Sequence, residues 1–128
     1  MCWTVQVRPP LPLGTRLLVT AFALSGVAHL VRPRLFEPLV PTPLPARRAL
    51  VYASGVAELA CAVGLQRRYR WAPRSAALVL LAVWPANGQH ALTTQRSNRA
   101  SRAEQALVWA RFPLQLPMIR AALRSPTD

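Results

Sequence analysis

The sequence has no lysine and little negative charge. Its sixteen basic residues are all arginine and only four residues are acidic, which gives a formal net charge of +12. The missing lysine suggests an arginine- and alanine-biased coding background, so charge alone does not identify a partner. Clustered arginine can neutralise nucleic-acid phosphates, but no arginine row here lines a DNA-reading helix and no aromatic-interleaved RNA motif occurs. We therefore expect no nucleic-acid partner.

Cysteine is equally scarce, since Cys2 and Cys61 are the only two. They form no CxxC pair, so neither a disulfide framework nor a zinc site is expected. Cys61 lies in an apolar run and is most simply a small buried hydrophobe. No motif for flavin, haem or an iron–sulfur cluster occurs either, and we expect no intrinsic cofactor.

Apolar residues, by contrast, make up 52% of the 128 residues. That is too many for a disordered basic chain, which could not bury a core. Charges that flank apolar spans are typical of membrane proteins, because they remain at the interface. The arginines gather in this way between apolar runs, at Arg32 and Arg34, at Arg47 and Arg48, within 67–74 and within 96–102.

Four apolar spans follow one another at residues 15–31, 49–65, 75–95 and 103–124. Each is about as long as a segment that crosses a bilayer, and the short joining loops make consecutive helices antiparallel neighbours. Residues 1–14 predict an irregular tail. Residues 32–46 hold five prolines, cannot form a continuous helix, and are expected to lie on the bilayer surface or over the helix ends. The predicted fold is all-α, a single-domain integral membrane four-helix bundle.

The first span and the membrane orientation each have an alternative. Arg8 and Arg16 before an apolar run, with a cleavage-like stretch at residues 25–28, also fit a secretory signal peptide. A water-soluble bundle would need polar residues at helical period, which the second and third spans lack. The arginines divide almost evenly between the two sides, and the dense 67–74 cluster favours cytoplasmic termini in a multi-pass protein of the cell membrane.

The third span changes character at Trp84-Pro85-Ala86-Asn87 and becomes apolar again at Ala91. In a soluble protein this would indicate a helix end followed by a loop. The return to apolar residues predicts a weakened turn within one continuous helix instead. Asn87 is then expected to hydrogen-bond Glu58 or Arg111, with Gln89 and His90 directed toward the outer loops.

Polar side chains inside the spans are costly in lipid, so each needs a partner or a function. In a structural interpretation, Glu58 neutralises Arg111 while Asn87 and Gln115 hydrogen-bond across helices. In a functional one, they bind a quinone ring or a small polar molecule, with Glu58 or His29 as a general base. The spacing does not suit metal ligands, and no metal site is predicted. The candidate ligand-binding residues are His29, Ser54, Glu58, Asn87, His90, Arg111 and Gln115.

Five short motifs occur in order along the chain: Gly26-x-x-His29-x-x-x-Pro33-x-x-Phe36, Val40-Pro41-x-Pro43-Leu44-Pro45, Ser54-Gly55-x-x-Glu58, Trp84-Pro85-Ala86-Asn87 and Arg111-x-Pro113-Leu114-Gln115. In this order they resemble the DoxX-like membrane proteins, and the resemblance covers residues 15–123. This resemblance implies a four-helix protein of bacterial cytoplasmic membranes, associated with redox or oxidative-stress complexes. Where family members often carry Ile or Met after the Asn, this chain has Gly88-Gln89-His90.

Three functions are compatible with these residues. The first is an accessory subunit of a quinone-linked membrane redox system, whose electrons come from a partner subunit. The second is an autonomous membrane enzyme acting on a small lipid-soluble substrate. The third is a small transporter or a scaffold for a partner helix, and transport would require a homo-oligomer because four spans without an inverted repeat give a poor path.

Overall fold

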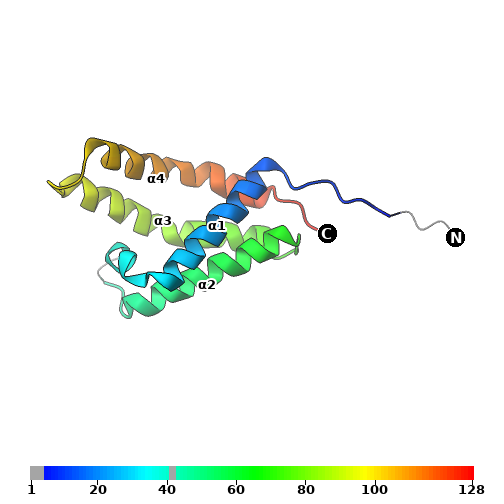
Figure 1. The fold of residues 1–128 in the computed structure, drawn as a ribbon, viewed down its shortest axis with the longest axis horizontal. Helices are drawn as coiled ribbons and strands as arrows, with labels where there is room; N and C mark the ends of the chain where they lie inside the picture. The colour runs from blue at the N-terminus through cyan, green and yellow to red at the C-terminus, as the bar shows by residue number, and fades with distance from the viewer. Residues whose placement is uncertain (1–4, 41–42) are drawn as a thin grey trace.

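The computed structural model describes residues 5–40 and 43–128, and this part of the chain is helical without any strand. It contains four α-helices and two short 3₁₀ helices, in the order α1 (Leu13–Val31), η1 (Pro33–Leu35), η2 (Glu37–Leu39), α2 (Arg47–Gln66), α3 (Ala72–Arg96) and α4 (Arg102–Leu123) (Figure 1). The all-helical prediction is therefore confirmed. Each α-helix begins and ends within one turn of the expected range. Of the predicted tail and loop, residues 1–4, including Cys2, and residues 41–42 lie outside the described residues.

Local sequence signals explain where the helices begin and end. Ser101 accepts a hydrogen bond from the backbone N–H of Glu104 at 3.1 Å and caps α4, as a Ser three residues before a Glu is expected to do. Pro73 occupies the first turn of α3, where its missing N–H has no cost. Pro33 follows α1 and prevents its continuation, because the residue before a proline avoids helical angles.

The prolines inside α3 and α4 do not end these helices. Pro85 lies in the interior of α3, which remains helical from Ala72 to Arg96. Pro113 and Pro117 lie within α4 in the same way. A helix end at Pro85 is therefore excluded, and the continuous helix predicted for this stretch is confirmed.

The four helices form two hairpins whose helices share a core at one end. α1 packs mainly on α2, and α3 mainly on α4 (Figure 1). The end nearer the termini holds one apolar core to which all four helices contribute, including Leu18, Cys61, Leu80 and Ala122. Toward the other end the hairpins diverge, and the loop between α3 and α4 extends away from α1 and α2 (Figure 1).

Side chains at the two ends of the molecule join segments that are distant in sequence. Thr15 at the start of α1 and Ser125 after α4 are buried and hydrogen-bond through their hydroxyls at 2.9 Å. At the opposite end η1 and η2 contact the helices, and Arg48 Nε donates to Glu37 Oε1 at 2.7 Å. The proline-rich loop thus folds over the helix ends, one of the two placements expected for it.

Two helices of the described residues, α1 and α2, are long and apolar enough to cross a membrane. The core helix of a soluble protein and a signal sequence have the same length and composition. A soluble core helix is, however, mostly covered by protein. Only 22% of the apolar stretch of α1 and 39% of that of α2 are buried.

Candidate functional site

The closest approach between α1 and α2 occurs at Gly26 and Gly55. A Cβ added at Gly55 would lie 2.8 Å from the Cβ of His29 and 3.0 Å from the carbonyl oxygen of Gly26. A Cβ added at Gly26 would lie 2.7 Å from Leu59 Cγ and 2.9 Å from the carbonyl oxygen of Gly55. Both positions therefore require glycine, and small residues at a helix crossing allow the backbones to touch.

The crossing is built from one short sequence that occurs twice. Residues 25–30 read Ser-Gly-Val-Ala-His-Leu and residues 54–59 read Ser-Gly-Val-Ala-Glu-Leu. The helices are antiparallel, so the two copies meet with their glycines at the centre. The fifth residue is the polar difference between the copies, and it places His29 opposite Glu58. The repeat explains why these two side chains meet.

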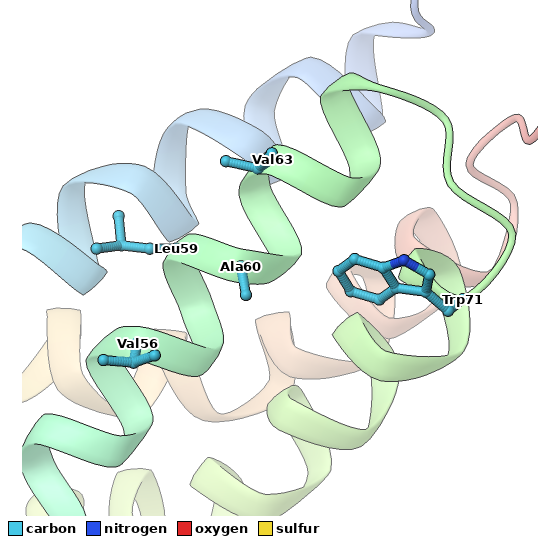
Figure 2. A pocket seen from close by; sticks show the side chains of 5 residues that line it. All are labelled: Val56, Leu59, Ala60, Val63 and Trp71. Carbon is cyan, nitrogen blue, oxygen red and sulfur yellow. The ribbon is translucent and has the colours of Figure 1, made fainter.

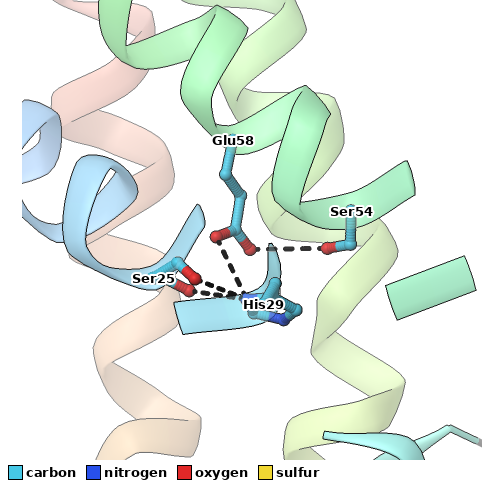
Figure 3. Close-up of polar contacts among 4 residues, drawn as sticks. All are labelled: Ser25, His29, Ser54 and Glu58. Atoms are coloured by element: carbon cyan, nitrogen blue, oxygen red, sulfur yellow. Dashed lines mark hydrogen bonds and ion pairs between the residues drawn. The ribbon is translucent and has the colours of Figure 1, made fainter. Parts of the chain in front are cut away.

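His29 and Glu58 form a buried pair between the helices (Figure 3). His29 Nδ1 lies 3.7 Å from Glu58 Oε2, and the two side chains are 12% and 6% exposed. Nδ1 also lies 2.6 Å from the carbonyl oxygen of Ser25. Because a carbonyl oxygen only accepts, Nδ1 carries a proton and donates it there.

The carboxylate of Glu58 is only partly satisfied. Ser54 Oγ donates to Oε1 at 3.4 Å from one helical turn away (Figure 3). The other oxygen, Oε2, is buried and accepts no hydrogen bond from the described residues, since 3.7 Å to Nδ1 exceeds hydrogen-bonding distance. A buried acceptor without a donor is unfavourable. Oε2 is therefore the atom of this site that can still accept a hydrogen bond.

An aromatic ring closes the site on the side of the proline-rich loop. The ring of Phe36, between η1 and η2, stacks on the imidazole of His29 with 3.8 Å between centroids and 19° between planes. The ion pair between Glu37 and Arg48 fastens the same loop to the start of α2. The imidazole and carboxylate of this site therefore lie between the helices, and an aromatic ring covers the imidazole.

A second polar contact lies between α3 and α4. Asn87 Nδ2 donates to Gln115 Oε1 at 3.2 Å, and Gln115 Nε2 donates to the carbonyl oxygen of Leu80 at 2.6 Å. Pro85 has no N–H to donate to the carbonyl oxygen of Leu81 one turn earlier, so one backbone hydrogen bond of α3 is missing near this contact. The predicted cross-helix bond between Asn87 and Gln115 is confirmed, and Gln115 is 3% exposed.

The candidate residues do not form a single cluster. His29, Ser54 and Glu58 meet between α1 and α2, whereas Asn87 and Gln115 meet between α3 and α4. Two expectations are wrong: Glu58 faces His29 and not Arg111, and Asn87 bonds Gln115 and neither Glu58 nor Arg111. The divergence of the hairpins separates these groups, and Arg111 is exposed on α4.

The remaining candidates lie toward the outer loops. Gln89 Nε2 is 3.4 Å from the carbonyl oxygen of Pro38 in the proline-rich loop. Gln89 was predicted to be directed toward the outer loops, and this contact agrees with that prediction. His90 is partly buried on α3, and no bond joins it to the His29 site in the described part of the chain. Within that part no three His, Cys, Asp or Glu side chains gather as a metal site would require.

Two contributors to the site were not among the predicted residues. Ser25 supplies the carbonyl that orients His29, and Phe36 supplies the aromatic cover. The repeated Ser-Gly-Val-Ala sequence would have indicated Ser25, because it occupies the position equivalent to Ser54. Phe36 lies in the loop, and only the fold of that loop brings it onto the imidazole.

One protein family matches the chain over most of its length. The family is the domain of unknown function DUF8561, and the match covers residues 18–125. This range includes α2, α3 and the residues of both polar contacts. Searches of curated proteins and of solved structures found no match. The chain therefore belongs to the family defined by the domain of unknown function DUF8561.

Proposed function

We propose that the protein is a multi-pass protein of the cell membrane whose four α-helices cross the bilayer. Large apolar side chains on the outside of the helices support this proposal. In water such a surface costs about 25 cal/mol per Å², whereas in lipid it has no such cost. The exposed apolar residues of the helices include Leu17, Leu24, Val27, Val31, Val56, Val63, Leu78, Leu81, Leu107, Leu114 and Leu116.

Within this protein, the pair of His29 and Glu58 is a quinone-contacting site of a membrane redox system. The observation that carries the proposal is Glu58 Oε2, a buried carboxylate oxygen without a hydrogen-bond donor beside a histidine. Polar groups that can ionise are rare in membrane interiors and usually have a function. The hydroxyl of a quinol can donate to such an oxygen, and an imidazole can exchange the accompanying proton.

The chain acts as an accessory subunit in this proposal, and electrons come from a partner subunit. His29 and Glu58 exchange protons but do not carry electrons. The resemblance of the sequence motifs to DoxX-like proteins supports a redox setting. Asn87 and Gln115 are assigned a structural role here, because each already has a partner in the described structure.

Binding of a soluble quinone analogue to the purified protein in detergent tests the proposal. The wild-type protein should bind the analogue, detected by a rise in melting temperature and a change in the quinone absorption spectrum. Glu58→Gln should weaken binding about tenfold or more, because a hydrogen bond to a charged group contributes about 1.5–3 kcal/mol. Glu104→Gln removes an exposed carboxylate of α4 and should leave binding unchanged.

Two results would contradict the proposal. The protein should remain in the membrane pellet after washing at high pH, and release into the supernatant would refute insertion. Absence of quinone binding by folded wild-type protein, or equal affinity in the Glu58→Gln and Glu104→Gln variants, would refute the quinone site.

A further inference from the structure

An apolar groove runs along α2. It is lined by Val56, Leu59, Ala60 and Val63 of α2 and by Trp71 at the start of α3 (Figure 2). Val56 and Val63 are 58% and 54% exposed, and Trp71 is 48% exposed. The groove is apolar along its length and ends at the indole, a side chain typical of the membrane interface.

The row of residues that lines the groove continues into an arginine. Val56, Ala60 and Val63 are spaced by four and three residues, so they share one face of α2. Arg67, the residue directly after the helix, follows Val63 by four residues. Arg74 follows Trp71 by three residues and lies on the same face of α3 as the indole. Both arginines are exposed, and neither guanidinium forms a hydrogen bond or ion pair within the described structure.

This end of the molecule has a large excess of positive charge. Its only described carboxylate side chain belongs to Asp128, which pairs with Arg8 at 2.6 Å. Arg70 is also engaged, because its Nε donates to the backbone carbonyl of Asp128 at 2.9 Å. The arginines at this end are Arg8, Arg16, Arg67, Arg68, Arg70, Arg74, Arg120 and Arg124. Anionic groups from outside the chain are needed to balance them.

We propose that the groove binds one acyl chain of an anionic phospholipid, with the phosphate of the headgroup held by Arg67 and Arg74. The inference rests on the membrane insertion proposed above but not on quinone binding. The apolar groove, with one arginine a helical turn beyond Val63 and another a turn beyond Trp71, both unpaired within the described residues, matches both parts of such a lipid. Arginine binds phosphate through paired N–H donors, and a juxtamembrane basic cluster attracts anionic lipid.

The thermal stability of the detergent-solubilised protein tests this inference. Phosphatidylglycerol should raise the melting temperature by several degrees, whereas phosphatidylcholine should have little effect. The double substitution Arg67→Gln and Arg74→Gln should remove most of the shift. The matched control, Arg96→Gln with Arg99→Gln, removes two exposed arginines at the opposite end and should retain it. Native mass spectrometry should show one bound phosphatidylglycerol in the wild type and in the control.

A second variant tests the acyl-chain part of the site. Ala60→Phe fills the groove and should abolish lipid retention, while Ala21→Phe on the exposed face of α1 should not. Equal stabilisation by the two lipids, or retention of the shift without Arg67 and Arg74, would overturn the inference. If the lipid stabilises the protein only when it dimerises, the inference is overturned, and a second copy of the chain occupies the groove instead. The variant with Arg67→Gln and Arg74→Gln should still bind the quinone analogue, because His29 and Glu58 are unchanged. A loss of lipid stabilisation with quinone binding intact therefore concerns the lipid site alone.

Discussion

The two ends of the helices differ in how they are held together. Near the termini, all four helices share an apolar core, and Leu65 and Leu80 are among its most deeply buried side chains. Near the loops, the hairpins diverge, and each is joined internally by polar contacts, His29 with Glu58 and Asn87 with Gln115. The core end is held by apolar packing shared among all four helices, and the other end by one polar contact within each hairpin.

This division indicates how a small protein can hold a polar site inside apolar helices. In the membrane location proposed above, the surrounding lipid is as apolar as a leucine side chain, so close packing rather than water exclusion would join the helices. The core end supplies that packing through leucines and alanines. The polar end can then keep Glu58 Oε2 without a donor, because the fold does not depend on satisfying it. The difference leads to three predictions of decreasing size.

Leu80→Ala should have the largest effect, because it opens a cavity where four helices meet. Leu80 is 2% exposed, and removing a buried leucine side chain costs about 2–5 kcal/mol. The free energy of unfolding in detergent should fall by that amount. Leu81→Ala is the control, since Leu81 is 47% exposed on the same helix and should change stability little. Equal losses for the two variants would contradict a core at this end.

Gly55→Ala should have an intermediate effect that is concentrated at the polar end. The added Cβ meets His29 Cβ and the Gly26 backbone, so α1 and α2 must separate, at about 1–3 kcal/mol for such overpacking. The His29 and Glu58 side chains separate with them, and quinone affinity should fall. Gly26→Ala should behave alike, because it occupies the equivalent position of the repeat.

Gly14→Ala provides the control for the glycine variants. Gly14 is exposed near the start of α1, and its added Cβ meets only the Cβ of Ala121, at 3.3 Å. Alanine favours the helix by about 1 kcal/mol relative to glycine, which offsets that tight contact. The contrary result is a Gly55→Ala variant that leaves quinone affinity unchanged and matches Gly14→Ala in stability. That result would show that the close contact of α1 and α2 does not position His29 and Glu58.

The helices could be predicted from the sequence because their signals are local. Apolar runs of sufficient length, prolines at their borders and arginines between them define the four helices and the proline-rich loop. The continuity of α3 through Pro85 also followed from a local signal, the return to apolar residues at Ala91. Such signals do not depend on which helices are neighbours.

The partners of the polar side chains could be predicted only in part. The sequence puts Glu58, Asn87 and Arg111 inside predicted helical spans but does not show which helix faces point at each other. Asn87 and Gln115 lie on consecutive helices and were paired correctly. Glu58 was assigned to Arg111 because opposite charges attract, yet the glycine crossing fixes it against His29. Contact geometry outweighed formal charge.

The third and smallest prediction concerns the bond between Asn87 and Gln115. A double-mutant cycle with Asn87→Ala and Gln115→Ala should give a coupling energy of about 0.6 kcal/mol, as is typical of hydrogen bonds between membrane helices. Gln115→Ala alone should cost more than Asn87→Ala, because it also frees the buried carbonyl of Leu80. The cycle is measured from unfolding free energies in detergent, with quinone binding as a second readout. Because the contact lies in the other hairpin, quinone affinity should stay unchanged in all three variants. A loss of quinone affinity as large as that of Glu58→Gln would mean that the two polar contacts form one site. Asn87 and Gln115 would then take part in binding, and their assignment to a structural role would be wrong.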